Sequence, residues 1–173
     1  MKLIKLSKGY FAKVDDESYD YLNQWKWHYQ PMISQGRAIG GYAQRWTYIR
    51  HPVDREYIKK VAVHMHRLVL NAPDDLIVDH INGDGVDNQK ANLRLATTLQ
   101  NCRNTKKAHN KSSIHKGVSW NKQHQRWRAR LEQKDLGFFK NEHLAALFYD
   151  FWATFRYGEF AKTNFQIIKQ TNQ

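Results

Sequence analysis

The sequence has very little cysteine and no long apolar segment. Cys102 is the single cysteine, so a disulfide within the chain and a Cys-rich zinc site are both excluded. We expect a reducing, intracellular environment. No apolar run approaches membrane-spanning length, and residues 1–5 lack the apolar region of a signal peptide. A membrane partner is therefore not expected.

Acidic residues are also scarce. There are 16 of them against 28 lysines and arginines, which gives a formal net charge of +12. Such a balance favours a polyanionic partner, nucleic acid before an anionic membrane. Residues 103–140 hold eleven of the basic residues and only two acids. This concentration indicates a binding surface, the alternative being a solvated basic face.

The 173 residues are enough for one ordinary domain or two small ones, and 41% of them are hydrophobic, which suffices for a packed core. Residues 1–60 have a β-rich pattern, with strand signals near the amino terminus and at residues 40–49. Acidic capping residues predict a short helix through Leu22. Trp25 and Trp27 are expected on one face of a strand, and we interpret the aromatics of this region as core.

An Asp-His pair stands at the end of a predicted strand, residues 76–80. A polar loop with turn glycines follows, then a predicted strand at residues 92–96 and a helix opened by a capping-box pattern. This order of elements can bring Asp79, His80 and Asn101 to one point.

The residue types at that point suit phosphodiester cleavage. Neutral histidine can deprotonate water near pH 7. Carboxylate and amide oxygens can hold Mg²⁺, which stabilises developing charge. The alternative is that Asp79 and His80 are ordinary loop residues and the asparagines cap turns. An EF-hand is excluded, because the spacing of the acids is wrong and no glutamate occupies the twelfth position.

The apolar residues 61–70 are compatible with either a helix or a strand beside this site. His64 and His66 lie there without a nearby third ligand, so no structural zinc is expected. Arg67 either reaches a phosphate or forms a structural ion pair.

Alternating residue types at 126–132 predict a strand with one apolar and one cationic face. The cationic face carries Arg126, Arg128 and Arg130, and the apolar face carries Trp127, Ala129 and Leu131. A helix is predicted after Asn141, with a stripe of apolar residues that we expect to be core: Leu144, Leu147, Phe148, Phe151, Trp152 and Phe155. Residues 105–111 are interpreted as a basic linker, which either follows the phosphate backbone or is a plain tether.

The central stretch also carries an ordered set of motifs: His66-Arg67-Leu68-Val69, Val78-Asp79-His80-Ile81-Asn82-Gly83-Asp84, Asp87-Asn88, Asn92-Leu93-Arg94 and Gln100-Asn101. Over residues 64–104 this set resembles the HNH endonuclease superfamily, specifically the phage and intron-encoded homing endonucleases. The resemblance implies a ββα-metal site in which Asp79 and Asn101 bind one divalent cation. It implies that His80 is the general base and that Asn92 braces the loop and orients His80.

The last family position, often histidine, is Asn101 here, which favours a hard cation over zinc. We therefore expect Mg²⁺, with Mn²⁺ as the alternative. Arg67 and Arg94 of this segment are predicted to contact DNA.

A second set of motifs lies in residues 112–165: Lys116-Gly117-Val118, Arg126-Trp127-Arg128-Ala129-Arg130-Leu131, Leu136-Gly137-Phe138-Phe139, Ala145-Ala146, Tyr149-Asp150, Phe155, Gly158 and Thr163-Asn164-Phe165. This set resembles the plant ethylene-response-factor (AP2/ERF) DNA-binding domain. The resemblance implies a three-stranded antiparallel sheet on one helix, with the sheet in the major groove. The residues predicted to contact DNA are Lys116, Ser119, Asn121, Lys122, Arg126, Arg128 and Arg130. The plant domains usually have arginine where Ser119 and Asn121 stand, so their base preference does not carry over.

We predict an α+β fold whose ββα-metal nuclease domain is followed by a sheet-and-helix DNA-binding domain. The predicted parts are a β-rich amino-terminal region of the nuclease domain (1–60), the HNH core (61–104), the linker (105–111), the AP2/ERF-like domain (112–165) and a tail (166–173).

The predicted function is metal-dependent endonuclease cleavage of double-stranded DNA. The carboxy-terminal domain largely selects the site, and each active site nicks one strand. We expect a monomer or a weak dimer on DNA, located in the cytoplasm or nucleoid of a bacterial host if the gene is phage-encoded. The alternatives are a sequence-specific transcription regulator with a non-catalytic nuclease fold and an RNA-binding or RNA-processing protein.

Overall fold

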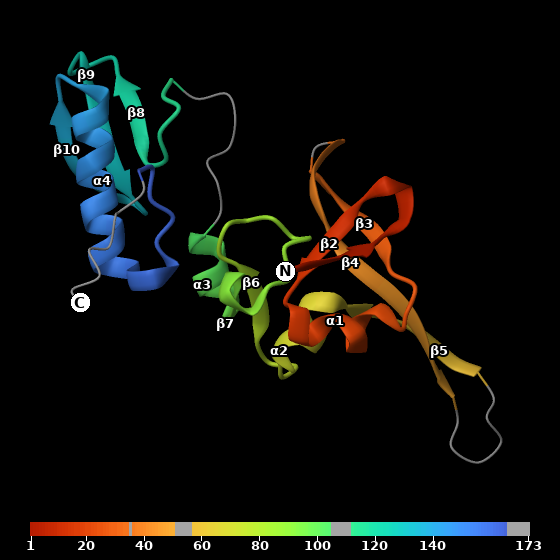
Figure 1. Cartoon of the computed structure of the whole chain (residues 1–173). Coiled ribbons are helices and arrows are strands. Elements are labelled where there is room, and N and C mark those ends of the chain that lie inside the picture. Colours follow the sequence, from red (N-terminus) through yellow and green to blue (C-terminus); the bar gives the residue numbers. More distant parts are fainter. Residues whose placement is uncertain (35, 51–56, 105–111, 166–173) are drawn as a thin grey trace. The chain divides into compact units, whose positions relative to one another are not determined.

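The computed structural model of the protein forms two compact units, Met1–Thr98 and Leu99–Gln173. It describes four stretches of the chain: residues 1–34, 36–50, 57–104 and 112–165 (Figure 1). The predicted linker (105–111) and tail (166–173) lie outside the described residues. Among the helices described, none combines the length and apolar character needed to cross a membrane.

The first unit begins with a hairpin and a helix, as predicted. Strands β1 (Lys2–Lys5) and β2 (Phe11–Val14) are antiparallel and are joined through the 3₁₀ turn η1 (Ser7–Gly9). The helix α1 (Asp16–Asn23) follows directly and has two acidic residues in its first turn, where the helix dipole favours them.

A three-stranded antiparallel sheet follows. Its strands lie in the order β3 (His28–Ser34), β4 (Arg37–Arg50) and β5 (Tyr57–His64). The predicted strand at residues 40–49 is thus the middle of β4. Trp25 and Trp27 precede β3, so the prediction that they share a strand face is wrong.

The central stretch has the predicted succession of elements. The segment at residues 61–70 divides between the end of β5 and the helix α2. The elements after β5 are α2 (Met65–Leu70), β6 (Ile77–His80), η2 (Lys90–Asn92), β7 (Leu93–Ala96) and α3 (Thr98–Arg103).

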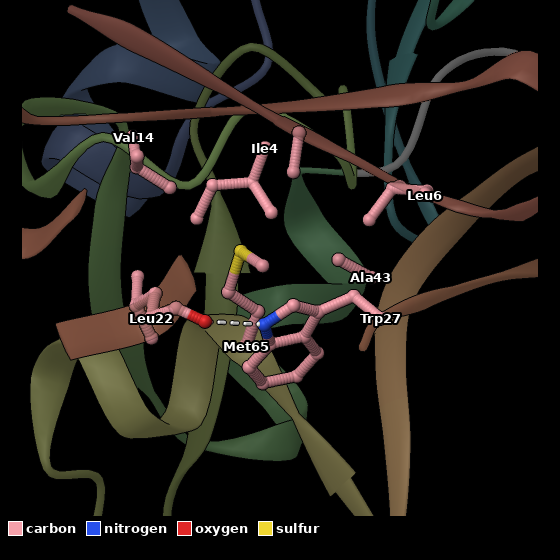
Figure 2. Packing of buried hydrophobic residues seen from close by; sticks show 8 residues of the cluster. Ile4, Leu6, Val14, Leu22, Trp27, Ala43 and Met65 are labelled. Carbon is pink, nitrogen blue, oxygen red and sulfur yellow. Dashed lines mark hydrogen bonds between the residues drawn. The ribbon is translucent and has the colours of Figure 1, made fainter. Parts of the chain in front are cut away.

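The core of the first unit joins the hairpin, α1, β4 and α2. It consists of Ile4, Leu6, Ala12, Val14, Leu22, Trp27, Ala43 and Met65 (Figure 2). Met65 is fully buried at the start of α2, and the indole of Trp27 donates a hydrogen bond of 2.8 Å to the carbonyl of Leu22. Trp27 is therefore a core residue, because its side chain points into the unit just before β3 begins. This packing anchors the start of α2, which carries His66.

The second unit is a three-stranded sheet covered on one face by a helix. The strands lie in the order β10 (Lys134–Phe139), β9 (Arg126–Leu131) and β8 (Val118–Asn121), all antiparallel. The helix α4 (Glu142–Tyr157) begins at the predicted cap, where the Asn141 side chain accepts a hydrogen bond from the amide of Leu144 at 3.2 Å. The buried cluster consists of Val118, Ala129, Ala145, Ala146, Tyr149 and Ala153.

The prediction that the apolar stripe of α4 is core is wrong. Its members remain 37% to 76% exposed, with Phe155 at the upper end. The face that packs on the sheet is built from alanines and Tyr149 instead. Gly117, just before β8, lets the Tyr149 ring lie directly against the backbone, because a Cβ at this position would overlap that ring. The helix is apolar on two sides, and helical spacing alone cannot tell which side faces the sheet.

Arg103, the last residue of the short helix α3, contacts the sheet and helix of the second unit. The guanidinium of Arg103 lies 4.3 Å from the centre of the Tyr157 ring and 3.8 Å from the Glu132 carboxylate. Lys116 Nζ donates a hydrogen bond of 2.7 Å to the carbonyl of Arg103. The helix that the resemblance assigns to the nuclease domain is thus attached to the carboxy-terminal sheet and helix.

Candidate active site

Asp79 and His80 are the last two residues of β6, and both are buried. The register of β6 against β7 sets Asp79 opposite Arg94 and His80 opposite Leu93. The exposed fractions of Asp79 and His80 are only 4% and 6%. Because neighbouring residues of a strand point to opposite faces, the two side chains enter different surroundings.

The carboxylate of Asp79 is held by Arg94. The Nε and Nη2 groups of Arg94 donate hydrogen bonds of 2.9 and 2.7 Å to Oδ2 of Asp79. Both side chains are at most 10% exposed. A buried carboxylate is costly without such a partner, so Arg94 balances the charge and fixes the orientation of Asp79. Arg94, which is predicted to contact DNA, thus binds Asp79, which is predicted to bind the metal.

The imidazole of His80 lies in a cluster of aromatic rings from four elements. The centroid of the His66 ring is 5.1 Å from that of His80, and the Tyr42 centroid is 5.8 Å from it. The rings of His64 and His66 stack on each other with centroids 5.2 Å apart. Among the described residues, no group of three His, Cys, Asp or Glu side chains is arranged to hold a metal ion.

The histidines of this cluster are uncharged at neutral pH. Burial lowers the pKa of His80 below its usual 6.5, while the hydrogen bond with Asn88 and the nearby carboxylates oppose this shift. Burial also lowers the pKa of His66 to about 3, with a further contribution from the charge of His80. A neutral imidazole at position 80 has the protonation state that a general base needs.

Asn88 is a site residue to which the sequence analysis assigned no role. It is completely buried, and its Oδ1 lies 3.4 Å from Nε2 of His80. The side-chain Nδ2 of Asn88 donates to the carbonyl of Val86 at 3.2 Å. The backbone N–H of Asn88 donates to the carbonyl of Lys13 at 2.8 Å. Asn88 belongs to the motifs quoted for the HNH resemblance. Its side chain points toward His80 because its backbone is bonded to Lys13 of β2, a contact that the motif does not show.

Asn92 closes the loop between β6 and β7. Its Oδ1 accepts a hydrogen bond from the amide of Asn82 at 3.0 Å. Its Nδ2 donates to Asn82 Oδ1 at 3.1 Å and to the carbonyl of Asp87 at 2.9 Å. These bonds give Asn92 a position that braces the loop. The imidazole of His80 contacts Asn88. An orienting effect of Asn92 on His80 stays a prediction.

The donor chemistry at the end of β6 fits a hard divalent cation. Asp79 supplies carboxylate oxygen, and the amide oxygen of Asn101 is the same class of ligand. Asn101 belongs to the second unit, and its convergence on Asp79 and His80 stays a prediction.

The cationic face predicted for residues 126–132 is present. Trp127, Ala129 and Leu131 of β9 pack with α4, so the alternating Arg126, Arg128 and Arg130 lie on the opposite face of the sheet. Asp135 of β10 lies among them, 3.8 Å from Arg128 Nε and 3.6 Å from Arg130 Nε. This carboxylate reduces the positive charge of the predicted cationic face.

Besides Arg94, two further residues predicted to contact DNA make hydrogen bonds within the protein. Arg67 donates to the carbonyls of Leu76 and Pro73 at 2.9 and 2.7 Å and closes the turn between α2 and β6. Lys116 binds the carbonyl of Arg103, and burial lowers the pKa of its amine.

The other predicted DNA contacts lie in β8 or directly after it. Ser119 pairs with Arg128 in the sheet and Asn121 pairs with Arg126, while Lys122 is exposed just beyond the strand. The Oδ1 of Asn121 also accepts a hydrogen bond from the amide of His124 at 2.8 Å, which stabilises the turn into β9.

Comparison with known proteins gives two findings. Residues 63–103, which include Asp79, His80 and Asn101, match the model of the HNH endonuclease family. An uncharacterized HNH endonuclease of Acanthamoeba polyphaga mimivirus is 29% identical over 170 residues, which cover 94% of this chain and 79% of the relative. Together these findings support an HNH endonuclease domain and therefore an enzyme, a nuclease that acts on DNA.

Proposed function

We propose that this protein is a metal-dependent, homing-type endonuclease that hydrolyses a phosphodiester bond of double-stranded DNA. The observation that carries the proposal is the adjacent pair at the end of β6: the buried, oriented carboxylate of Asp79 and the buried imidazole of His80, whose pKa burial lowers. The first suits a hard cation, and the second suits proton abstraction from water at neutral pH.

The hydrogen bonds of Asn88 support Nδ1 as the basic nitrogen of His80. Because Nδ2 of Asn88 donates to the carbonyl of Val86, its Oδ1 is the atom that faces His80. The oxygen of a side-chain amide can only accept a hydrogen bond, so in this arrangement Nε2 of His80 carries the proton. The lone pair is then on Nδ1, which takes the proton of the attacking water.

The remaining residues position this base and the phosphate. Arg94 orients Asp79, and Asn92 holds the loop that follows His80. Asp79 and Asn101 would hold one divalent cation, Mg²⁺ or alternatively Mn²⁺. When bound, the cation supplies stabilisation of charge on the scissile phosphate and the departing 3′ oxygen. The products then carry 3′-hydroxyl and 5′-phosphate ends.

The carboxy-terminal unit is proposed to select the site as an AP2/ERF-like DNA reader. Its support is the face of Arg126, Arg128 and Arg130, which lies opposite α4 and so is not used for packing against the helix. Arginine contacts to phosphates would position the sheet, and contacts to base edges would give specificity. One active site per chain implies that each chain nicks one strand.

One observation favours a second candidate, a DNA-binding regulator with a non-catalytic nuclease fold. The Asp79 carboxylate is paired with Arg94, and a carboxylate with such a partner is less attractive to a cation. This candidate predicts the same DNA binding without cleavage.

Incubation of supercoiled plasmid that carries the target region tests the proposal. We expect open circles with Mg²⁺ or Mn²⁺, none with EDTA, and none with His80→Ala or Asp79→Ala. Gel-shift titration is the control, because both variants should bind the same duplex as tightly as the wild type. Binding by the wild type without cleavage in either metal would decide for the regulator.

A further inference from the structure

The outer side of α4 is an unusually large apolar surface for a basic protein. We define the α4 outer face as Leu144, Leu147, Phe148, Phe151, Trp152 and Phe155. The most exposed members are Phe155 at 76% and Phe151 at 63%, and even Phe148 and Trp152 remain 37% exposed. Since a fully exposed aromatic side chain presents about 150–250 Å², the face totals roughly 700 Å². The largest apolar patch of a typical monomer is about 300–600 Å² and is often functional.

A shallow groove adjoins this face. It lies between α4 and the β9–β10 turn and has a volume of about 380 Å³. Phe148, Trp152 and Phe155 line one side, and Leu131 and Leu136 line the other. The rings of the face also contact one another, with 5.8 Å between the centroids of Trp152 and Phe155. The surface is therefore continuous and has both protruding and recessed parts.

We propose that the α4 outer face binds the same face of a second copy of this chain, with the two helices antiparallel across a twofold axis. The inference goes beyond the proposed function and does not rest on it, because the α4 outer face contains neither the residues proposed for cleavage nor the arginines of the sheet. An area of roughly 700 Å² per chain is close to the roughly 800 Å² per partner of a standard stable interface.

The spacing of the face makes it complementary to itself. Its members recur at intervals of three, one, three, one and three residues, which read the same in both directions. An antiparallel twofold therefore brings Leu144 to the level of the partner's Phe155, Leu147 to the level of the partner's Trp152 and Phe148 to the level of the partner's Phe151. Two of these pairs match a smaller leucine with a larger aromatic ring, and the partner's Leu144 comes beside the groove that Phe155 lines.

The charges beyond the two ends of α4 agree with this arrangement. Lys140 precedes the helix and Glu159 follows it, at equal distances along the sequence from the centre of the face. Both are exposed. The same twofold places Lys140 near the partner's Glu159, and antiparallel helices also oppose their dipoles favourably. A parallel arrangement would instead put like charges together at both ends.

Sedimentation velocity of the full chain, at high salt to suppress repulsion between basic surfaces, tests this proposal. We expect the wild type to dimerise below about 100 µM, since interfaces of this size have dissociation constants of micromolar or less. Phe151→Glu should raise the dissociation constant by more than tenfold. Ile114→Glu is the matched control, because Ile114 is apolar, 85% exposed and outside the face, and should leave dimerisation unchanged.

A charge exchange distinguishes the antiparallel pair from other dimers. Lys140→Glu or Glu159→Lys alone should weaken dimerisation at moderate salt by placing like charges together, and the double variant should restore it. A wild type that stays monomeric across this concentration range would overturn the proposal. So would a dimer that Phe151→Glu leaves intact, or single and double exchanges of equal effect. None of these outcomes bears on cleavage, so the proposed function is tested separately.

Discussion

At the scale of single residues, the site depends on two side chains that are buried with dedicated partners. Asp79 has Arg94, and His80 has Asn88. Each partner sets a property that the functional group lacks alone: the charge balance and direction of the carboxylate, and the tautomer of the imidazole. Substitutions of the partners therefore test the site without removing its reactive atoms.

Replacing Arg94 by alanine should destabilise the first unit. It leaves the Asp79 carboxylate buried without its guanidinium partner, which typically costs about 3–5 kcal/mol. Urea denaturation should show this loss in the free energy of unfolding. Arg37→Ala, at an exposed position of the same unit, should change it by less than about 0.5 kcal/mol. Equal effects of the two substitutions would mean that the buried ion pair contributes little.

The pH dependence of cleavage should follow the protonation of His80. A general base acts when it is neutral, so the rate should rise with pH through the pKa of His80 and be constant above it. Because burial lowers that pKa, the rise should lie below pH 6.5. Asn88→Asp adds a negative charge beside the imidazole, which raises the pKa and should move the rise to higher pH. Rate profiles of both proteins measure this, and an unshifted profile would contradict the assigned contact.

At the scale of elements, the carboxy-terminal segment is tied to the second unit by one buried carboxylate. Asp150 of α4 accepts hydrogen bonds of 2.8 to 2.9 Å from the amide and side chain of Asn164 and one of 2.9 Å from the amide of Phe165. Asn164 in turn donates to the carbonyl of Lys116, just before β8. Residues 164–165 thus connect α4 to the segment that precedes β8.

Asp150→Ala should therefore destabilise the second unit by about 2–4 kcal/mol, because several donors lose a charged acceptor. Chemical denaturation followed by tryptophan fluorescence measures the change, since three tryptophans, Trp120, Trp127 and Trp152, lie in this unit. Asp135→Ala is the control acid, as Asp135 is half-exposed and should have a much smaller effect. Similar losses for both would exclude a special role of Asp150.

The same exposed acid gives a test of the sheet face. Asp135 lies beside Arg128 and Arg130, so its charge should oppose DNA binding. Asp135→Asn is expected to raise the affinity for duplex DNA, whereas Arg126→Ala should lower it and reduce the salt slope by about one. Fluorescence anisotropy over a salt series measures both. An affinity that neither substitution alters would place DNA elsewhere on the protein.

At the scale of the whole molecule, cleavage and site selection should be separable. His80→Ala should abolish nicking and leave duplex affinity and its salt dependence unchanged. The variant with both Arg126→Ala and Arg128→Ala should bind more weakly and with less preference for the target, yet still nick at saturating protein. Parallel assays on one duplex measure the nicking rate, the affinity and its salt dependence for each variant. A second duplex without the target measures the preference for the target. Loss of cleavage at full occupancy in the arginine variant would show that the sheet acts in the reaction itself.

The sequence alone determined most of the local structure. Strands, helices and the cap at Asn141 follow from short-range periodicity and capping, which are properties of neighbouring residues. The order of motifs likewise placed Asp79 and His80 at the end of a strand, and the family match agrees with that segment. The alternation at residues 126–132 gave the cationic face for the same reason.

Only the tertiary structure decided which surfaces are buried and which partners meet. Periodicity marks an apolar face on α4 but cannot show that the alanine side packs on the sheet and leaves the aromatic side outside. Likewise, the pairing of Arg94 with Asp79, the approach of Asn88 to His80 and the attachment of Arg103 to Tyr157 join residues from different elements. Such contacts depend on strand register and packing, which a single sequence does not encode locally.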